Sequence, residues 1–219
     1  MKQHHGIVAI AGAITLAAGT VLLAAEHARS VSPDDALAKL KAGNQRFATS
    51  QVTEGKPVAA RRAETAQSQH PFAIIVGCAD SRTSPELVFD QNVGDLFVVR
   101  TAGNLVGEHA LGSIEYAVEH LGVRLIVVLG HERCGAVKAA LATATAPGHV
   151  NSVVRDIQPA VNATKGKAGD PLDLAVNENA SQVAARIRSE ANLGELATSV
   201  RVVVGVYDLD TGKVEWPKE

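Results

Sequence analysis

Short continuous apolar runs alternate along the chain with longer stretches of helical spacing. The runs at 72–76, 96–99 and 123–129 show no alternation with polar residues, which is typical of strands buried on both faces of a parallel sheet. A fourth run lies at 200–207 and is followed by turn-forming residues, after which 214–216 returns as a hairpin strand. The pattern therefore predicts a mainly parallel sheet with one hairpin strand at its C-terminal end.

Helical periodicity fills the intervals between these runs. The spacing of apolar residues predicts helices over 109–120, 134–143, 150–161 and 171–191. Strands that alternate with helices predict an α/β fold, here a single domain with a mainly parallel central sheet flanked by helices. We place this domain at 71–219.

An N-terminal helix and arm are expected at 26–70, before that domain. The Ser-Pro-Asp-Asp segment at 32–35 combines a capping residue, a proline suited to the first helical position and two acids that favour the positive end of the helix dipole. Gly43-Asn44 is a stop signal, although Phe47 favours another turn. The polar stretch at 50–70 lacks periodicity and is predicted to be an extended or mobile arm.

The first 25 residues have the pattern of a secretory signal peptide. Lys2 and two histidines precede an apolar run at 6–25 that is rich in alanine and glycine and ends in small residues. The alternative is an uncleaved membrane anchor, because a run of about twenty residues can span a bilayer. The glycine and threonine content and the small-residue end favour cleavage. Either interpretation places the folded domain outside the cytoplasm, as a periplasmic or secreted protein.

Composition narrows the function classes. The 219 residues suit one domain after removal of a leader. Hydrophobic residues make up 46% and aromatic residues only 3%, so the core is expected to consist of Ala, Val, Ile and Leu. The net charge of −2 predicts no basic surface, which disfavours nucleic acid as a partner.

The two cysteines both lie in polar motifs that follow predicted strands. Cys78 begins Cys-Ala-Asp-Ser-Arg, while His131 and Cys134 bound His-Glu-Arg-Cys. The carboxyl ends of parallel strands meet at one edge of a sheet, so these side chains can lie together. Two thiolates and one imidazole suit zinc and leave a fourth position for water, as in catalytic zinc sites. The alternative is a disulfide, which exported proteins often form and which needs no nearby His, Asp or Arg.

Asp80 and Arg82 could be a plain surface ion pair. Beside a metal site, however, Asp80 has two alternative roles. Paired with Arg82, Asp80 stays ionised and can accept a hydrogen bond from zinc-bound hydroxide. Unpaired, it can bind zinc as a fourth ligand and close the site. The residues alone leave both the open and the closed arrangement available.

Taken together, these motifs resemble the β-class carbonic anhydrases. The resemblance covers the chain from about Asp34 to Val214 as an ordered set of segments. They are Ala-Lys-Leu-Lys-Ala-Gly-Asn-Gln-Arg-Phe at 38–47, Cys-Ala-Asp-Ser-Arg at 78–82, Arg-Thr-Ala-Gly-Asn at 100–104, Ser-Ile-Glu-Tyr-Ala-Val at 113–118, Gly-His-Glu-Arg-Cys-Gly-Ala at 130–136 and Val-Tyr-Asp at 206–208.

The resemblance implies a specific reaction. One Zn²⁺ per subunit would be bound through Cys78, His131 and Cys134, with Asp80 and Arg82 as a catalytic dyad. The implied activity is the reversible hydration of carbon dioxide to bicarbonate and a proton by zinc-bound hydroxide.

The resemblance also implies further site residues and a homodimer or a dimer of dimers. Gln69 matches a glutamine that plant-type members hold near the zinc-bound solvent across a dimer interface. Phe97 and Tyr116 match aromatics that line a small apolar pocket for carbon dioxide, and Ala102 and Gly103 fall beside it. The alternatives are core packing for the two aromatics and a solvated loop position for Gln69.

Two other functions are compatible with the same motifs. One is hydrolysis of another small electrophile such as carbon disulfide, and the other is a non-catalytic module that binds zinc or bicarbonate. The presence of both Asp80 and Arg82 disfavours the second. Ile75 stands where bicarbonate-regulated members carry tryptophan, so the chain resembles the unregulated type.

Overall fold

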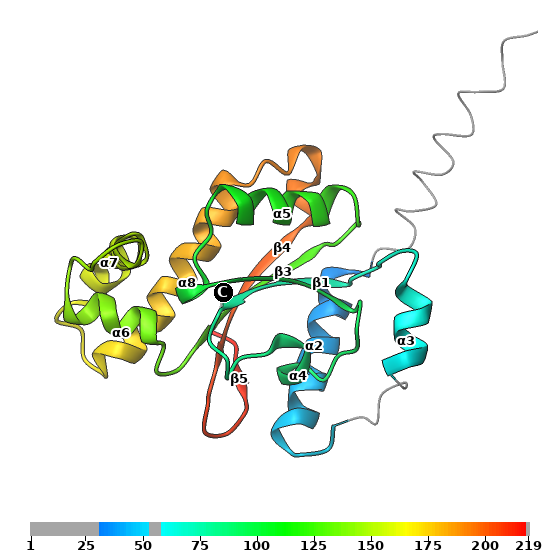
Figure 1. Cartoon of the computed structure of the whole chain (residues 1–219), viewed down its shortest axis with the longest axis horizontal. Coiled ribbons are helices and arrows are strands. Elements are labelled where there is room, and N and C mark those ends of the chain that lie inside the picture. The colour runs from blue at the N-terminus through cyan, green and yellow to red at the C-terminus, as the bar shows by residue number, and fades with distance from the viewer. Residues whose placement is uncertain (1–30, 53–57, 218–219) are drawn as a thin grey trace, which may run out of the picture. The chain divides into compact units, whose positions relative to one another are not determined.

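In the computed structural model, which describes residues 31–52 and 58–217, one sheet contains five strands in the order β2-β1-β3-β4-β5 (Figure 1). The four parallel strands are β1 (Ala73–Cys78), β2 (Leu96–Thr101), β3 (Leu125–His131) and β4 (Arg201–Tyr207). Strand β5 (Val214–Glu215) pairs antiparallel with β4. The predicted α/β fold with a C-terminal hairpin strand is confirmed, while the predicted leader at 1–25 lies outside the described residues.

Strands β1 and β3 lie side by side in the centre of the sheet, and every residue of both is buried. This burial explains why their sequences are continuously apolar. Gly77 of β1 is in register with Leu129 of β3. Both strands therefore end at the same edge of the sheet, with Cys78 and His131 as their last residues.

Helices cover both faces of this sheet. On one face, α5 (Glu108–Glu119) and α8 (Pro171–Glu190) pack on a core that includes Ile74 and Ile126. On the other, α2 (Pro33–Ala48) packs on a core that includes Ile75. Figure 1 shows these as layers on either side of the strands. Neighbouring residues of β1 thus point to opposite cores, as the strand repeat of two requires.

A third apolar cluster surrounds the two cysteines. It is built with α6 (Gly135–Ala142), α7 (Val150–Thr164) and the N-terminal half of α8. The predicted bounds of α6 and α8 agree with the structure to within one residue, and α7 runs three residues beyond its predicted end. The short elements α4 (Pro85–Val88), η1 (Ala102–Asn104) and η2 (Gly194–Ser199) were not predicted, because single turns carry no periodicity.

Helix α2 continues through the predicted stop signal. Gly43 is needed for close packing, since a Cβ there would lie 1.8 Å from the backbone oxygen of Phe89. The buried Asn44 side chain donates to the carbonyls of Val88 and Gly212 and accepts from the Val214 N–H. Both residues therefore serve tertiary contacts in mid-helix.

The prediction of an extended arm at 50–70 was wrong in its central part, where the structure has helix α3 (Val58–Thr65). None of its residues is buried. Arg61 instead anchors the helix, donating to the Val93 carbonyl at 2.8 Å and pairing with Asp95 at 2.6 Å. Because these contacts lie more than thirty residues away, local periodicity did not indicate them. Within 31–52 and 58–217, no helix is both long and apolar enough to cross a membrane.

Candidate metal centre

Three ligand-type side chains converge at the carboxyl edge of the sheet. Cys78 ends β1, His131 ends β3, and Cys134 directly precedes α6. Their ligand atoms all lie within 4.8 Å of one another and all three residues are buried. A tetrahedral zinc ion holds two thiolate sulfurs roughly 3.8 Å apart, so the cluster has the right scale. Both cysteines are free, so the disulfide that was the alternative to a zinc site is not formed in this structure.

The His131 ring is oriented as a metal ligand. Its Nδ1 lies 2.9 Å from the Glu132 carbonyl oxygen, which can only accept, so Nδ1 carries the proton. In the neutral ring the Nε2 atom then has a free lone pair. Nε2 is buried and has no hydrogen-bond partner among the described residues. A buried polar atom without a partner is costly, and a bound zinc ion would satisfy it.

The contact between the two thiol groups shifts their pKa values in opposite directions and favours the proton on Cys134. Hydrogen bonding with Cys134 is the main cause that lowers the pKa of Cys78, and burial opposes it. The same contact raises the pKa of Cys134, and burial raises it further. Since zinc binds thiolates, its binding must release this proton.

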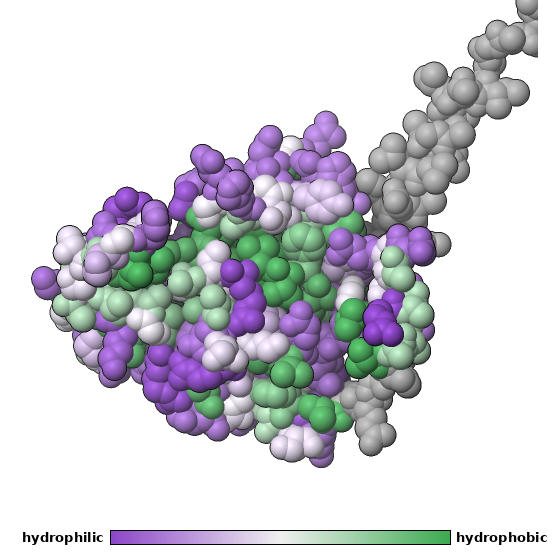
Figure 2. All heavy atoms as spheres, in the orientation of Figure 1, coloured by the Kyte–Doolittle hydropathy of each residue, from purple (hydrophilic) through white to green (hydrophobic). Residues whose placement is uncertain are grey.

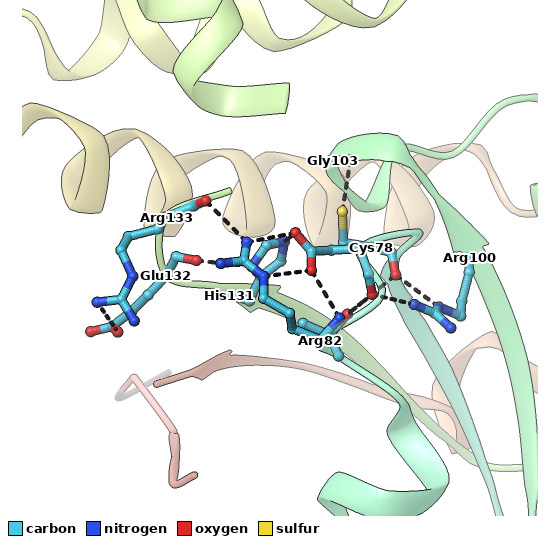
Figure 3. Close-up of polar contacts among 9 residues, drawn as sticks. Cys78, Arg82, Arg100, Gly103, His131, Glu132 and Arg133 are labelled. Atoms are coloured by element: carbon cyan, nitrogen blue, oxygen red, sulfur yellow. Dashed lines mark hydrogen bonds and ion pairs between the residues drawn. The ribbon is translucent and has the colours of Figure 1, made fainter. Parts of the chain in front are cut away.

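Asp80 and Arg82 form a two-pronged ion pair at the mouth of the site. Arg82 donates through Nε to Oδ1 at 2.8 Å and through Nη2 to Oδ2 at 2.7 Å (Figure 3). The Arg82 hydrogen bond is the largest cause that lowers the pKa of Asp80. Asp80 Oδ2 also lies 3.9 Å from His131 Nε2. The carboxylate is thus ionised and close to the ligand cluster, but turned toward Arg82.

Two further residues hold the Cys78 turn through contacts that could not be predicted from the sequence. Arg100 donates through Nε to the Cys78 carbonyl and through Nη2 to the Asp80 carbonyl. The Gly103 N–H donates to Cys78 Sγ at 3.3 Å, as Figure 3 shows. Both residues belong to the Arg-Thr-Ala-Gly-Asn segment at 100–104, which contains the last two residues of β2 and the whole of η1. The signal in the sequence was that this segment follows a predicted strand and belongs to the motifs that resemble the β-class carbonic anhydrases.

The other predicted site residues do not all lie at the ligand cluster. Ala102 and Gly103 lie in η1, beside the cluster. Phe97 is half-buried on β2, opposite Ile74 and well before the end of the strand. Tyr116 is 48% exposed on α5, and Gln69 is exposed between α3 and β1. Among the described residues no hydrogen bond joins Gln69 or Tyr116 to the ligand cluster, and their roles stay predictions.

The fold and the Cys–His–Cys cluster define a zinc-binding α/β protein. The family model described as carbonic anhydrase matches residues 73–214. A carbonic anhydrase from Mycolicibacterium smegmatis is 42% identical over 194 residues, which cover 84% of this chain and 93% of that protein. The chain therefore belongs to the carbonic anhydrase family.

Solved structures show that it has the β-class fold. The Coccomyxa β-carbonic anhydrase in complex with acetazolamide is 29% identical, with a TM-score of 0.64 over 79% of this chain and 82% of that one. One of two tetrameric β-carbonic anhydrases from Sordaria macrospora is 22% identical, with a TM-score of 0.62 over 72% of this chain and 89% of that one. The latter likeness supports the fold alone.

Proposed function

We propose that this chain catalyses the reversible hydration of carbon dioxide to bicarbonate and a proton, with one zinc ion per subunit. The observation that carries the proposal is the convergence of two sulfurs and one buried imidazole nitrogen that has no hydrogen-bond partner among the described residues, in a member of this family. Three protein ligands leave one position of a tetrahedral ion for the reacting water.

Zinc in this position supplies, as in carbonic anhydrases generally, a Lewis acid that lowers the pKa of a coordinated water. The protein's own residues prepare its surroundings. Ionised Asp80 presents an acceptor oxygen beside the cluster, where it can receive a hydrogen bond from the reacting water. Arg82 keeps this carboxylate charged and oriented. The buried sulfurs and the His131 ring close the other sides of the site.

The Asp80–Arg82 geometry supports the open arrangement of the site. Arg82 engages both carboxylate oxygens, and its backbone N–H donates to Oδ1 as well. Asp80 would have to break these contacts in order to bind zinc. We therefore expect carbon dioxide hydration to be measurable near neutral pH, whereas a closed site would become active only above about pH 8.

The test is zinc content measured together with carbon dioxide hydration. We expect one zinc ion per chain, and loss of both metal and activity in Cys78→Ser and His131→Ala. Assays with carbon disulfide separate the rival hydrolase, which would hydrolyse this compound faster than it hydrates carbon dioxide. Full hydration activity in a zinc-free preparation would overturn the proposal. Bound zinc without any turnover would favour the non-catalytic module.

We further propose a homodimer that completes the substrate pocket. Strand β2 is the edge of the sheet, and its apolar residues are only half-buried. Figure 2 shows apolar atoms exposed between α5 and α4. Gln69 and Tyr116 are exposed, which suits residues that act at a subunit interface. Light scattering should give a dimer or a dimer of dimers, and a monomer with full activity would contradict this proposal.

We also propose that the mature domain is exported, on the basis of the signal-like run at 6–25. The mass of the protein recovered from the periplasm or medium of an expressing bacterium tests this. We expect loss of about 25 residues. Recovery of the uncut chain from the cytoplasm alone would contradict export.

A further inference from the structure

A buried asparagine on α8 reaches the metal centre through η1. Asn179 is 3% exposed, and its Nδ2 donates to the Gly103 carbonyl oxygen at 2.9 Å. Gly103 in turn donates its N–H to Cys78 Sγ at 3.3 Å. A relay of two hydrogen bonds therefore connects helix α8 with a metal-binding sulfur.

The apolar surroundings of Asn179 make this contact unusual. Its helix neighbours Val176, Ala180 and Val183 are all buried in apolar clusters. Burial of an amide in such a place is costly unless it is hydrogen-bonded. The one hydrogen bond that the Asn179 side chain makes among the described residues goes to Gly103. The Gly103 carbonyl therefore accounts for a polar residue among these apolar neighbours.

Gly103 needs such a restraint because its N–H must point at the Cys78 sulfur. Glycine is the residue type whose backbone is least restricted by itself. Its φ of +69° is left-handed, and a Cβ there would lie 2.9 Å from Ile157 Cδ1. Glycine fits this space but has the widest choice of backbone angles. The Asn179 hydrogen bond holds the residue in the conformation that directs its N–H to the sulfur. The coupling is geometric, because the N–H and the carbonyl of Gly103 belong to different peptide groups.

We propose that Asn179 is a positioning residue that sets the Gly103 N–H···Sγ hydrogen bond and thereby the zinc affinity and donor strength of Cys78. Hydrogen bonds to a ligand atom tune the metal as the ligands themselves do. A thiolate that accepts an N–H donates less charge to the ion, which leaves the ion more electrophilic. The inference rests on the zinc centre proposed above.

The test compares Asn179→Leu with a matched control on the same helix. Asn177 is exposed and donates only to the carbonyl of Asp173, one turn earlier, so Asn177→Ala should behave as wild type. In Asn179→Leu we expect zinc affinity, measured by competition with a chelator, to fall about 10-fold or more. In the cobalt-substituted protein, the sulfur-to-metal charge-transfer band should move to lower energy, because the sulfur loses a hydrogen bond.

A second variant protects the test against simple misfolding. Asn179→Ser keeps a hydroxyl that can bond to the helix backbone but is too short to reach Gly103, so it should show the same band shift. If both variants retain wild-type affinity and band energy and lose only stability, Asn179 merely satisfies a buried carbonyl and the inference is overturned. If wild-type protein itself shows no thiolate-to-cobalt band, the zinc centre fails instead.

Discussion

Gly103→Ala is the perturbation whose cost follows most directly from the structure. The residue has φ +69°, which costs an L-residue with a Cβ about 1–2 kcal/mol. The new methyl would lie 2.9 Å from Ile157 Cδ1 and 3.3 Å from Ala136 Cβ. Ile157 is fully buried in the apolar cluster that contains the two cysteines, so its side chain would have to shift against packed neighbours. Overpacking of this kind costs about 1–3 kcal/mol.

Together these costs predict a loss of roughly 2–5 kcal/mol in the free energy of unfolding. Urea denaturation of the zinc-loaded protein measures this loss, because the transition midpoint falls in proportion to it. Zinc affinity should fall as well, since the strain displaces the N–H that faces Cys78 Sγ.

Gly112→Ala is the matched control. Gly112 lies inside α5, and within one subunit a Cβ there meets nothing within 4 Å. Alanine should therefore stabilise the helix by up to about 1 kcal/mol. If the free energy of unfolding of Gly103→Ala lies within about 0.5 kcal/mol of wild type, the left-handed backbone and the close contacts at η1 do not constrain this position.

Other expected outcomes test separate parts of the molecule. Asp80→Asn keeps the shape of the side chain but removes its charge, so hydration should fall about 10- to 100-fold with zinc still bound; unchanged turnover would contradict a role for this carboxylate. The pKa of Asp80 is lower in the folded protein than in the unfolded chain, so ionised Asp80 makes a small stabilising contribution above the unfolded pKa of about 4. This contribution is lost as pH falls through the folded pKa. The free energy of unfolding of wild type and of Asp80→Asn, measured at decreasing pH, should therefore converge. Zinc affinity should fall with decreasing pH, since the raised pKa of Cys134 makes protons compete with the metal; chelator competition at several pH values checks this, and affinity independent of pH would count against two thiolate ligands. Asn44→Ala removes three hydrogen bonds of a buried side chain and should cost about 3 kcal/mol of unfolding free energy, with zinc content unchanged; a loss below about 1 kcal/mol would show that water replaces them.

The ligand set could be predicted from the sequence because its signals are local. Continuous apolar runs identify buried parallel strands, and such strands end together at one edge. Cys78 and His131 come at the ends of two such runs, and Cys134 follows His131 by three residues, directly before helix α6. Asp80 and Arg82 are close in sequence, which makes their pairing possible, but the sequence is equally compatible with Asp80 binding the metal.

What the amino-acid sequence by itself determined is therefore the α/β fold and the identity of the metal ligands, since both follow from periodicity and short motifs. Only the tertiary structure decided the helix at 58–65, the packing role of Gly43-Asn44 and the link from Asn179 to the metal-binding sulfur. Asn179 and Gly103 are 76 residues apart. No local pattern specifies such a hydrogen bond, because it forms only when packing of the helices on the sheet has brought the two segments together.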